Sequence, residues 1–154
     1  MVKKILLGLL VLLLAIQFIR QTKNLGPSPS PTDIQVQHPA SPEVQRLLET
    51  ACYDCHSNHT RYPWYVEVQP VGWWLADHIK EGKEHVNFSE FDLLTPKRAA
   101  RKLPPCADEV TDGGMPLSSY KLAHPEARLT EAQRKTLADW FDSLREKIPA
   151  EAIK

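Results

Sequence analysis

Cysteines are few in this chain, charge of neither sign is in excess, and an alternating strand pattern is missing. Three cysteines are too few for a disulfide framework. Lysine and arginine together number 19, as do aspartate and glutamate, so nucleic acid is not an expected partner. Because neither strand alternation nor an internal repeat is visible, the sequence predicts an all-α domain.

Two of the three cysteines stand in one short motif, Cys52-Tyr53-Asp54-Cys55-His56. This is Cys-x-x-Cys-His, the attachment site of a c-type haem. The two intervening residues place both sulfurs near one edge of a porphyrin, where they can form thioethers with its vinyl groups. His56 follows directly and would lie under the ring. The sequence therefore predicts one covalently attached haem c, held by Cys52 and Cys55, with His56 as the proximal iron ligand.

Other uses of a Cys-x-x-Cys pair find less support in the surrounding sequence. A thioredoxin-like redox pair would need strand-helix alternation around it, which is absent here. Half of a zinc site would need a second Cys-x-x-Cys or a His-x-x-x-His, and the chain has neither. The third cysteine, Cys106, is expected to be a small buried apolar residue without a functional role.

The sixth iron ligand is expected to be Met115, the only methionine besides Met1. It lies in the loop sequence Asp112-Gly113-Gly114-Met115-Pro116, where glycines allow the backbone to come close to a ring. A thioether opposite the proximal histidine would give His/Met ligation, which raises the reduction potential. The alternative is that Met115 merely fills space beside the haem.

Histidines compete with Met115 for the sixth position. His59 is too close to the proximal histidine to reach the opposite face easily. His78 lies on the apolar face of a predicted helix, where a lone histidine is usually a core residue. His85 and His124 are expected to be solvated loop residues. Met115 is preferred, and a histidine ligand remains the open alternative.

Residues 1–23 are predicted to be a signal-anchor segment. Lys3 and Lys4 precede an apolar run over 5–19 that only Gln17 interrupts. As a helix the run spans about 22 Å, slightly short for a full crossing and slightly long for a signal-peptide core. No cleavage pattern follows it, which favours an uncleaved membrane helix over a cleaved signal. Because haem c is attached on the outer face of energy-transducing membranes, we expect a periplasmic domain anchored in a bacterial cytoplasmic membrane.

Residues 24–40 are predicted to be a linker, because 26–32 is rich in proline and serine. An extended spacer of this length would hold the domain on the order of 40–50 Å from the membrane. The haem domain is then expected over 41–148, followed by a C-terminal tail over 149–154.

Four helices are expected inside the domain. The first begins at Ser41-Pro42 and runs into the haem motif. A second follows Pro70 and weakens at Gly82. A third starts at Thr95-Pro96, and the pair Pro104-Pro105 is expected to stop it. The last begins with a capping box, Thr130-Glu131-Ala132-Gln133, and carries an apolar stripe.

This order of elements resembles a small monohaem cytochrome c, and longer motifs resemble one family. They are Cys52-Tyr53-Asp54-Cys55-His56-Ser57-Asn58, Thr60-Arg61-Tyr62-Pro63-Trp64-Tyr65, Gln69-Pro70-Val71-Gly72-Trp73-Trp74-Leu75, Asn87-Phe88-Ser89 and Gly114-Met115-Pro116-Leu117-Ser118-Ser119-Tyr120. Over most of 41–146 the chain is similar to the bacterial haem-binding-domain family, short membrane-tethered proteins with one Cys-x-x-Cys-His. The resemblance implies a small cytochrome c-like helical domain that binds haem.

Two functions compete on these residues. The first is a one-electron carrier that meets redox partner proteins in the periplasm or membrane, because no catalytic constellation stands near the motif. The second is a haem enzyme or sensor, peroxidase-like or binding a diatomic gas, with a labile sixth position and His78 on the distal side. A haem-bearing interaction module is a less specific third reading. Arg61 could pair with a haem propionate, although a surface arginine is the commoner outcome.

Overall fold

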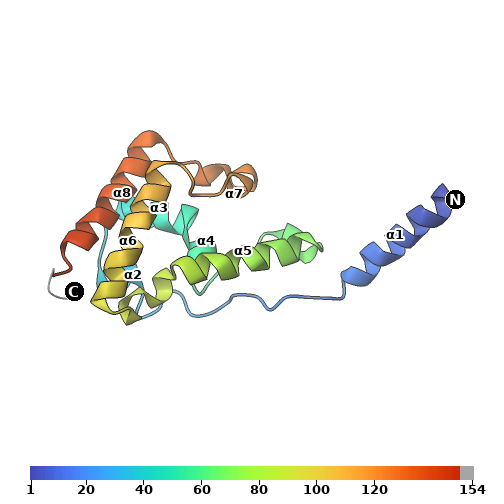
Figure 1. The fold of residues 1–154 in the computed structure, drawn as a ribbon, viewed down its shortest axis with the longest axis horizontal. Coiled ribbons are helices and arrows are strands. Elements are labelled where there is room, and N and C mark those ends of the chain that lie inside the picture. The colour runs from blue at the N-terminus through green and yellow to red at the C-terminus, as the bar shows by residue number, and fades with distance from the viewer. Residues whose placement is uncertain (150–154) are drawn as a thin grey trace.

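The computed structural model describes residues 1–149, and this part of the chain is helical without a named strand, as predicted (Figure 1). One isolated bridge joins Leu25 to His59. The helices are α1 Val2–Ile16, α2 Ile34–Gln37, α3 Pro42–Ala51, α4 Tyr53–His56, α5 Val71–His85, α6 Pro96–Thr111, α7 Ser118–Ala123 and α8 Glu131–Glu146, with the 3-10 helices η1 Trp64–Glu67, η2 Phe88–Leu93 and η3 Pro125–Ala127. The predicted tail 149–154 lies, apart from Pro149, outside the described residues.

The helix before the haem motif forms where its sequence signals place it. The Ser41 hydroxyl accepts a hydrogen bond from the Val44 N–H at 3.3 Å and caps α3, with Pro42 in the first turn. Val44, Leu47 and Leu48 are buried on one face. Cys52 ends α3 and precedes α4, so the motif folds as a direct continuation of a packed helix.

The main core lies where α6 and α8 pack along each other. Leu103, Ala107 and Val110 of α6 are buried, as are Leu137 and Phe141 of α8. The capping box expected at the start of α8 is present, with hydrogen bonds in both directions between Thr130 and Gln133. This pairing fixes the long helix that follows the Met115 loop against the last helix of the domain.

The prediction that Pro104 and Pro105 stop the third helix was wrong, because α6 continues through both to Thr111. Two prolines inside a helix remove two N–H donors and cost roughly 3 kcal/mol or more each. Burial of the α6 core face on both sides of the pair opposes that cost, at about 1.5–3 kcal/mol for each large apolar side chain. Packing against α8 therefore outweighs the local signal.

The spacer prediction was also wrong for residues 24–37, which lie against the domain. The Asn24 amide donates to the Ser57 carbonyl at 2.9 Å, and the Gly26 N–H donates to the Asn58 carbonyl at 2.7 Å. Further along, the Ile34 side chain is completely buried. Prolines prevent a long helix here, but an extended backbone still offers donors and acceptors that a neighbouring loop can pair.

The N-terminal helix α1 extends away from the domain in Figure 1, and an extended segment connects it to the rest of the chain. It ends at Ile16, earlier than the end of the apolar run, and none of its residues is buried. Within residues 1–149, no helix combines the length and the apolar character that a membrane crossing requires.

Candidate haem site

The four predicted haem residues line one cavity of about 550 Å³. Cys52, Cys55 and His56 come from the junction of α3 and α4, and Met115 comes from the loop after α6. Gly82 and other residues of α5 form a further wall. The continuation of α6 through its prolines carries the chain to the loop that places Met115 in this wall.

The short helix α4 puts the motif residues on one turn. The N–H groups of Cys55 and His56 donate to the Cys52 carbonyl at 3.2 and 2.9 Å. Helix α5 passes so close that a Cβ at Gly82 would lie 2.9 Å from the Cys55 carbonyl oxygen. Glycine at 82 therefore serves this close approach, and α5 runs on to His85.

His56 is oriented for metal binding by its backbone contact. Its Nδ1 lies 3.0 Å from the Val86 carbonyl oxygen. A carbonyl only accepts, so Nδ1 carries the proton and Nε2 keeps a free lone pair, the arrangement typical of metal-binding histidines. Burial lowers the pKa of His56, which favours the neutral imidazole that an iron ligand requires.

Both cysteines of the motif have a raised pKa. Burial raises the pKa of Cys52 to about 12 and that of Cys55 to about 11. A reactive redox cysteine has a lowered pKa, so the raised values do not favour the dithiol redox use of the pair. Within the described part of the chain, no group of three His, Cys, Asp or Glu residues is placed to hold a metal ion.

The Met115 loop is held by its own backbone. Gly113 has a φ of +79°, a left-handed conformation that favours glycine. The Met115 N–H donates to the Glu109 carbonyl of α6 at 3.0 Å, and Pro116 after it is buried. The glycines thus let the chain turn back at the end of α6, as their presence in the sequence indicates.

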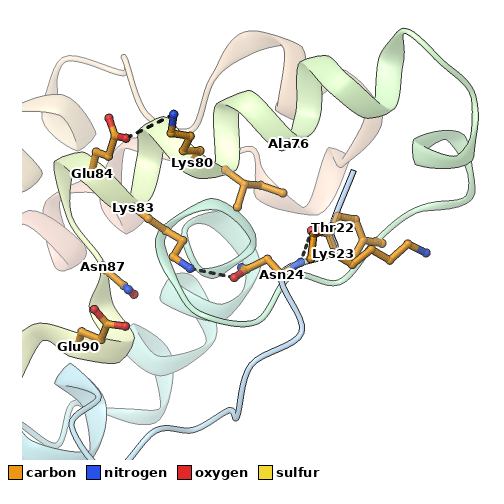
Figure 2. Close-up of a pocket in the computed structure, with 11 residues that line it drawn as sticks. Thr22, Lys23, Asn24, Ala76, Lys80, Lys83, Glu84, Asn87 and Glu90 are labelled. Carbon is orange, nitrogen blue, oxygen red and sulfur yellow. Dashed lines mark hydrogen bonds and ion pairs between the residues drawn. The ribbon is translucent and has the colours of Figure 1, made fainter. Parts of the chain in front are cut away.

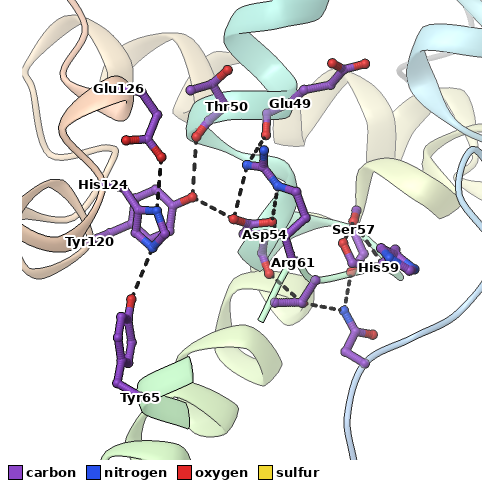
Figure 3. A network of polar contacts seen from close by, with 12 residues as sticks. Glu49, Thr50, Asp54, Ser57, His59, Arg61, Tyr65, Tyr120, His124 and Glu126 are labelled. Carbon is purple, nitrogen blue, oxygen red and sulfur yellow. Dashed lines mark hydrogen bonds and ion pairs between the residues drawn. The ribbon is translucent and has the colours of Figure 1, made fainter. Parts of the chain in front are cut away.

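A polar network connects the haem motif to the helix after the Met115 loop (Figure 3). Asp54, between the two cysteines, is 6% exposed. Its carboxylate accepts from the Arg61 Nε at 3.0 Å, from the Arg61 N–H at 3.1 Å and from the Tyr120 hydroxyl at 2.7 Å. Tyr120 also lines the cavity, so this network closes one side of it.

The same network extends to His124, which the sequence placed in a solvated loop. That prediction was wrong, because the His124 side chain is only 17% exposed and its ring stacks on Tyr120 at 4.2 Å. Its Nδ1 lies 3.2 Å from the Glu126 carboxylate, and its Nε2 lies 3.1 Å from the Tyr65 hydroxyl.

On the opposite side of the motif, Tyr53 bonds to the N-terminal segment. Its hydroxyl donates to the Asp33 carboxylate at 2.6 Å, and the Gln35 N–H donates to the same oxygen at 2.9 Å. Asp33 is 1% exposed, and its second carboxylate oxygen has no hydrogen-bond partner within residues 1–149. The segment expected to be a free linker therefore forms part of the support of the motif.

The competing histidines divide into two groups. His59 and His124 do not line the cavity, whereas His78 and His85 do. His78 is half-buried on the cavity wall rather than packed in the core as expected, and its Nδ1 donates to the Trp74 carbonyl at 2.9 Å. A free Nε2 lone pair on His78 therefore keeps it as the alternative sixth ligand.

The sequence missed the contribution of α6 to this site. Arg61 does not line the cavity, and its guanidinium pairs with Asp54. Arg101, Lys102 and Cys106 do line it. The helical spacing of these residues could have indicated that they share one face. It was not used in the prediction, because the helix was expected to end at Pro104-Pro105. Cys106 is only partly buried, its thiol donates to the Lys102 carbonyl, and burial raises its pKa to about 12.

A second cavity of about 500 Å³ lies on the other side of α5 (Figure 2). It is bordered by Thr22, Lys23 and Asn24 and by polar side chains of α5. Lys83 donates to the Asn24 amide oxygen at 2.9 Å across it. The described residues that line it include no cysteine, histidine or methionine, whereas the four predicted haem residues line the first cavity.

Comparison with known proteins shows the family of this chain. A family model described as "Haem-binding domain" matches residues 11–143. The chain belongs to the haem-binding domain family. No curated protein and no solved structure matches it. The donor set of this haem-binding domain fits the group: two thiols on one turn, an oriented neutral imidazole and a thioether line one cavity.

Proposed function

We propose that this haem-binding domain carries one haem c and transfers single electrons on the periplasmic side of a bacterial cytoplasmic membrane. Cys52 and Cys55 would form the thioethers, His56 would be the proximal ligand and Met115 the sixth ligand. The observation that supports this most directly is that all four residues line a single cavity, although Met115 is remote in sequence.

The bound iron would supply the chemistry, which is a one-electron exchange between the ferrous and ferric states. The chain orients the ligands for it. The Val86 carbonyl fixes the His56 ring, and the backbone bond from Met115 to Glu109 fixes the loop that presents the thioether. A methionine ligand raises the reduction potential and leaves the iron without an open position.

The location rests on the N-terminal sequence. We propose that the apolar run 5–19 lies in the membrane and anchors the domain, because the helix formed by most of it has no buried residue. Electrons would pass to and from redox partner proteins in the periplasm or membrane. Because haem c is attached outside the cytoplasm, the domain would lie on the periplasmic side.

Covalent attachment is tested by the mass and the haem stain of the mature protein on a denaturing gel. We expect the added mass of one haem and a stained band. A matched variant with Cys52→Ser and Cys55→Ser should lose both signals, whereas Cys106→Ser should keep them. A wild-type chain that has only its polypeptide mass would overturn the proposal.

A second function, a haem enzyme or sensor with a labile sixth position, is favoured by the two histidines in the cavity wall, His78 and His85. The ferric spectrum separates the two. The carrier predicts a far-red methionine–iron charge-transfer band that disappears in Met115→Ala and persists in His78→Ala. A high-spin ferric spectrum in the wild type would support the enzyme or sensor.

A further inference from the structure

The residues just after α1 form hydrogen bonds with the start of α5. The Gln17 side-chain amide donates to the Gln69 carbonyl at 3.1 Å and accepts from the Gln69 N–H at 2.9 Å. The Trp73 indole N–H donates to the Ile19 carbonyl at 2.8 Å. Because these bonds join the exit of the apolar run to the start of α5, the domain has a defined position beside α1.

Two ion pairs meet at the same place. Glu67 of η1 accepts from Arg20 at 3.3 Å and from Lys23 at 2.5 Å, and the Glu67 carbonyl accepts from Arg20 at 2.6 Å. Each pair is about half exposed and contributes little by itself. Together with the Gln17 and Trp73 contacts they join residues 17–23 to residues 67–73.

Large apolar side chains are exposed at this end of the domain. Trp64 is 81% exposed, and Val68, Val71 and Trp74 are 45%, 38% and 45% exposed. We call these four side chains the apolar end face. Val71 and Trp74 share one side of the first turn of α5, and η1 packs against that turn. Figure 1 shows this end of α5 directed toward α1.

We propose that the apolar end face lies in the interfacial layer of the lipid bilayer that holds α1. This inference rests on the proposed membrane location of the apolar run. A helix that is apolar on all sides is stable in a protein core or in a membrane, and α1 has no buried residue. The end face continues from the exit of that helix, and tryptophan is enriched at membrane–water interfaces. Lipid therefore covers both α1 and the apolar end face.

The arrangement places the haem cavity near the membrane. The Trp74 ring lies 4.3 Å from the His78 ring, one helical turn along α5, and His78 lines the cavity. A free spacer would have let the domain move far from the surface, whereas these contacts hold the cavity beside it. The redox partner that fits this position is a protein bound in or at the same membrane.

Photo-crosslinking of the full-length, haem-loaded protein in phosphatidylcholine vesicles tests the occupant of the apolar end face. Trp64→benzoylphenylalanine is the probe, and Leu122→benzoylphenylalanine on α7 is its control, because the two native side chains are 81% and 78% exposed. We expect a lipid adduct about tenfold more abundant at position 64, where the interface predicts lipid contact. Trp73→Phe, which removes the bond to Ile19, should reduce that yield.

Equal lipid yields at the two positions, or a dimer adduct at position 64 in place of lipid, would overturn the inference. Haem staining of the same gel lanes keeps the two proposals separate. A stained band without lipid adduct at position 64 contradicts the membrane contact alone. An unstained band contradicts haem attachment whatever the crosslink shows.

Discussion

The two residues between the cysteines of the haem motif are held on opposite sides of the domain by different means. Tyr53 donates to Asp33, a carboxylate that has one further donor, the Gln35 N–H. Asp54 is itself the carboxylate, and it accepts bonds from the backbone and side chain of Arg61 and from Tyr120. The Asp33 carboxylate therefore has one phenol and one backbone N–H as donors, whereas the Asp54 carboxylate has several side-chain and backbone donors.

This difference indicates which contact is replaceable. A buried carboxylate is costly unless enough donors surround it. Asp54 would keep the Arg61 bonds if Tyr120 lost its hydroxyl, but Asp33 would keep only a backbone N–H if Tyr53 lost its hydroxyl. The same chemical deletion should therefore have unequal consequences on the two sides of the motif.

The largest loss of stability is expected from Asp54→Ala, which removes the carboxylate that accepts the bonds from Arg61 and Tyr120. The partly buried Tyr120 hydroxyl keeps only the longer bond to the Thr50 carbonyl at 3.4 Å, and the Arg61 N–H loses the Asp54 acceptor, so we expect a loss of about 2–4 kcal/mol in unfolding free energy. Denaturant unfolding of the haem-loaded protein measures it. Arg61→Ala is the control and should cost about 1 kcal/mol or less, because the Arg61 side chain is 59% exposed. Equal losses in the two variants would contradict this account of the network.

Tyr53→Phe should have the next largest effect. It leaves the Asp33 carboxylate, which is 1% exposed, with a single hydrogen bond, and we expect a loss of about 2–3 kcal/mol. The unfolding midpoint in urea, at unchanged slope, is the measurement. Asp33→Asn combined with Tyr53→Phe should be less destabilising than the sum of the two changes, because the buried charge is then removed.

Tyr120→Phe should cost less, about 1–1.5 kcal/mol, because Asp54 retains its Arg61 bonds. Because α7 follows the Met115 loop, we also expect the methionine–iron charge-transfer band to weaken in this variant and to be unchanged in Tyr53→Phe. If Tyr120→Phe destabilises the protein as much as Tyr53→Phe does, the proposed contrast between the two sides fails.

The smallest effect concerns alkaline pH. Burial, followed by the hydrogen bond to a carboxylate, raises the pKa of both Tyr53 and Tyr120 above the ordinary value of 10.0. The unfolded chain then releases these protons first, so their stabilising contribution is present below pH 10 and is lost as the pH rises above it. The melting temperature of the wild type should fall more steeply above that pH than that of the Tyr53→Phe, Tyr120→Phe double variant. If the melting temperatures of the two proteins fall in parallel as the pH rises, neither phenol causes the alkaline loss of stability.

Local signals in the sequence predicted local structure well. The cap at Ser41 and the capping box at Thr130 mark the starts of α3 and α8, since each motif satisfies the N–H groups of its own first turn. Residues 112–116 likewise form the loop that their glycines and proline indicate. These features depend on residues only a few positions apart.

Long-range packing decided the features that the sequence did not predict. Pro104 and Pro105 are strong local breakers, but α8 offers a buried face that keeps α6 helical through both. Residues 24–37 are rich in proline, but partners in the loop after α4 and in η2 hold them against the domain. His124 is polar, but Tyr65 and Glu126 enclose it.

The sequence by itself determined the haem motif, the all-helical character and the apolar N-terminal run, because spacing and periodicity within a short stretch carry that information. Only the tertiary structure decided that Met115 shares a cavity with His56, that Asp33 and Tyr120 support the motif from opposite sides, and that Gln17 and Trp73 join α1 to α5. Each of these contacts connects distant parts of the chain. Their formation depends on how whole helices pack, which no local pattern specifies.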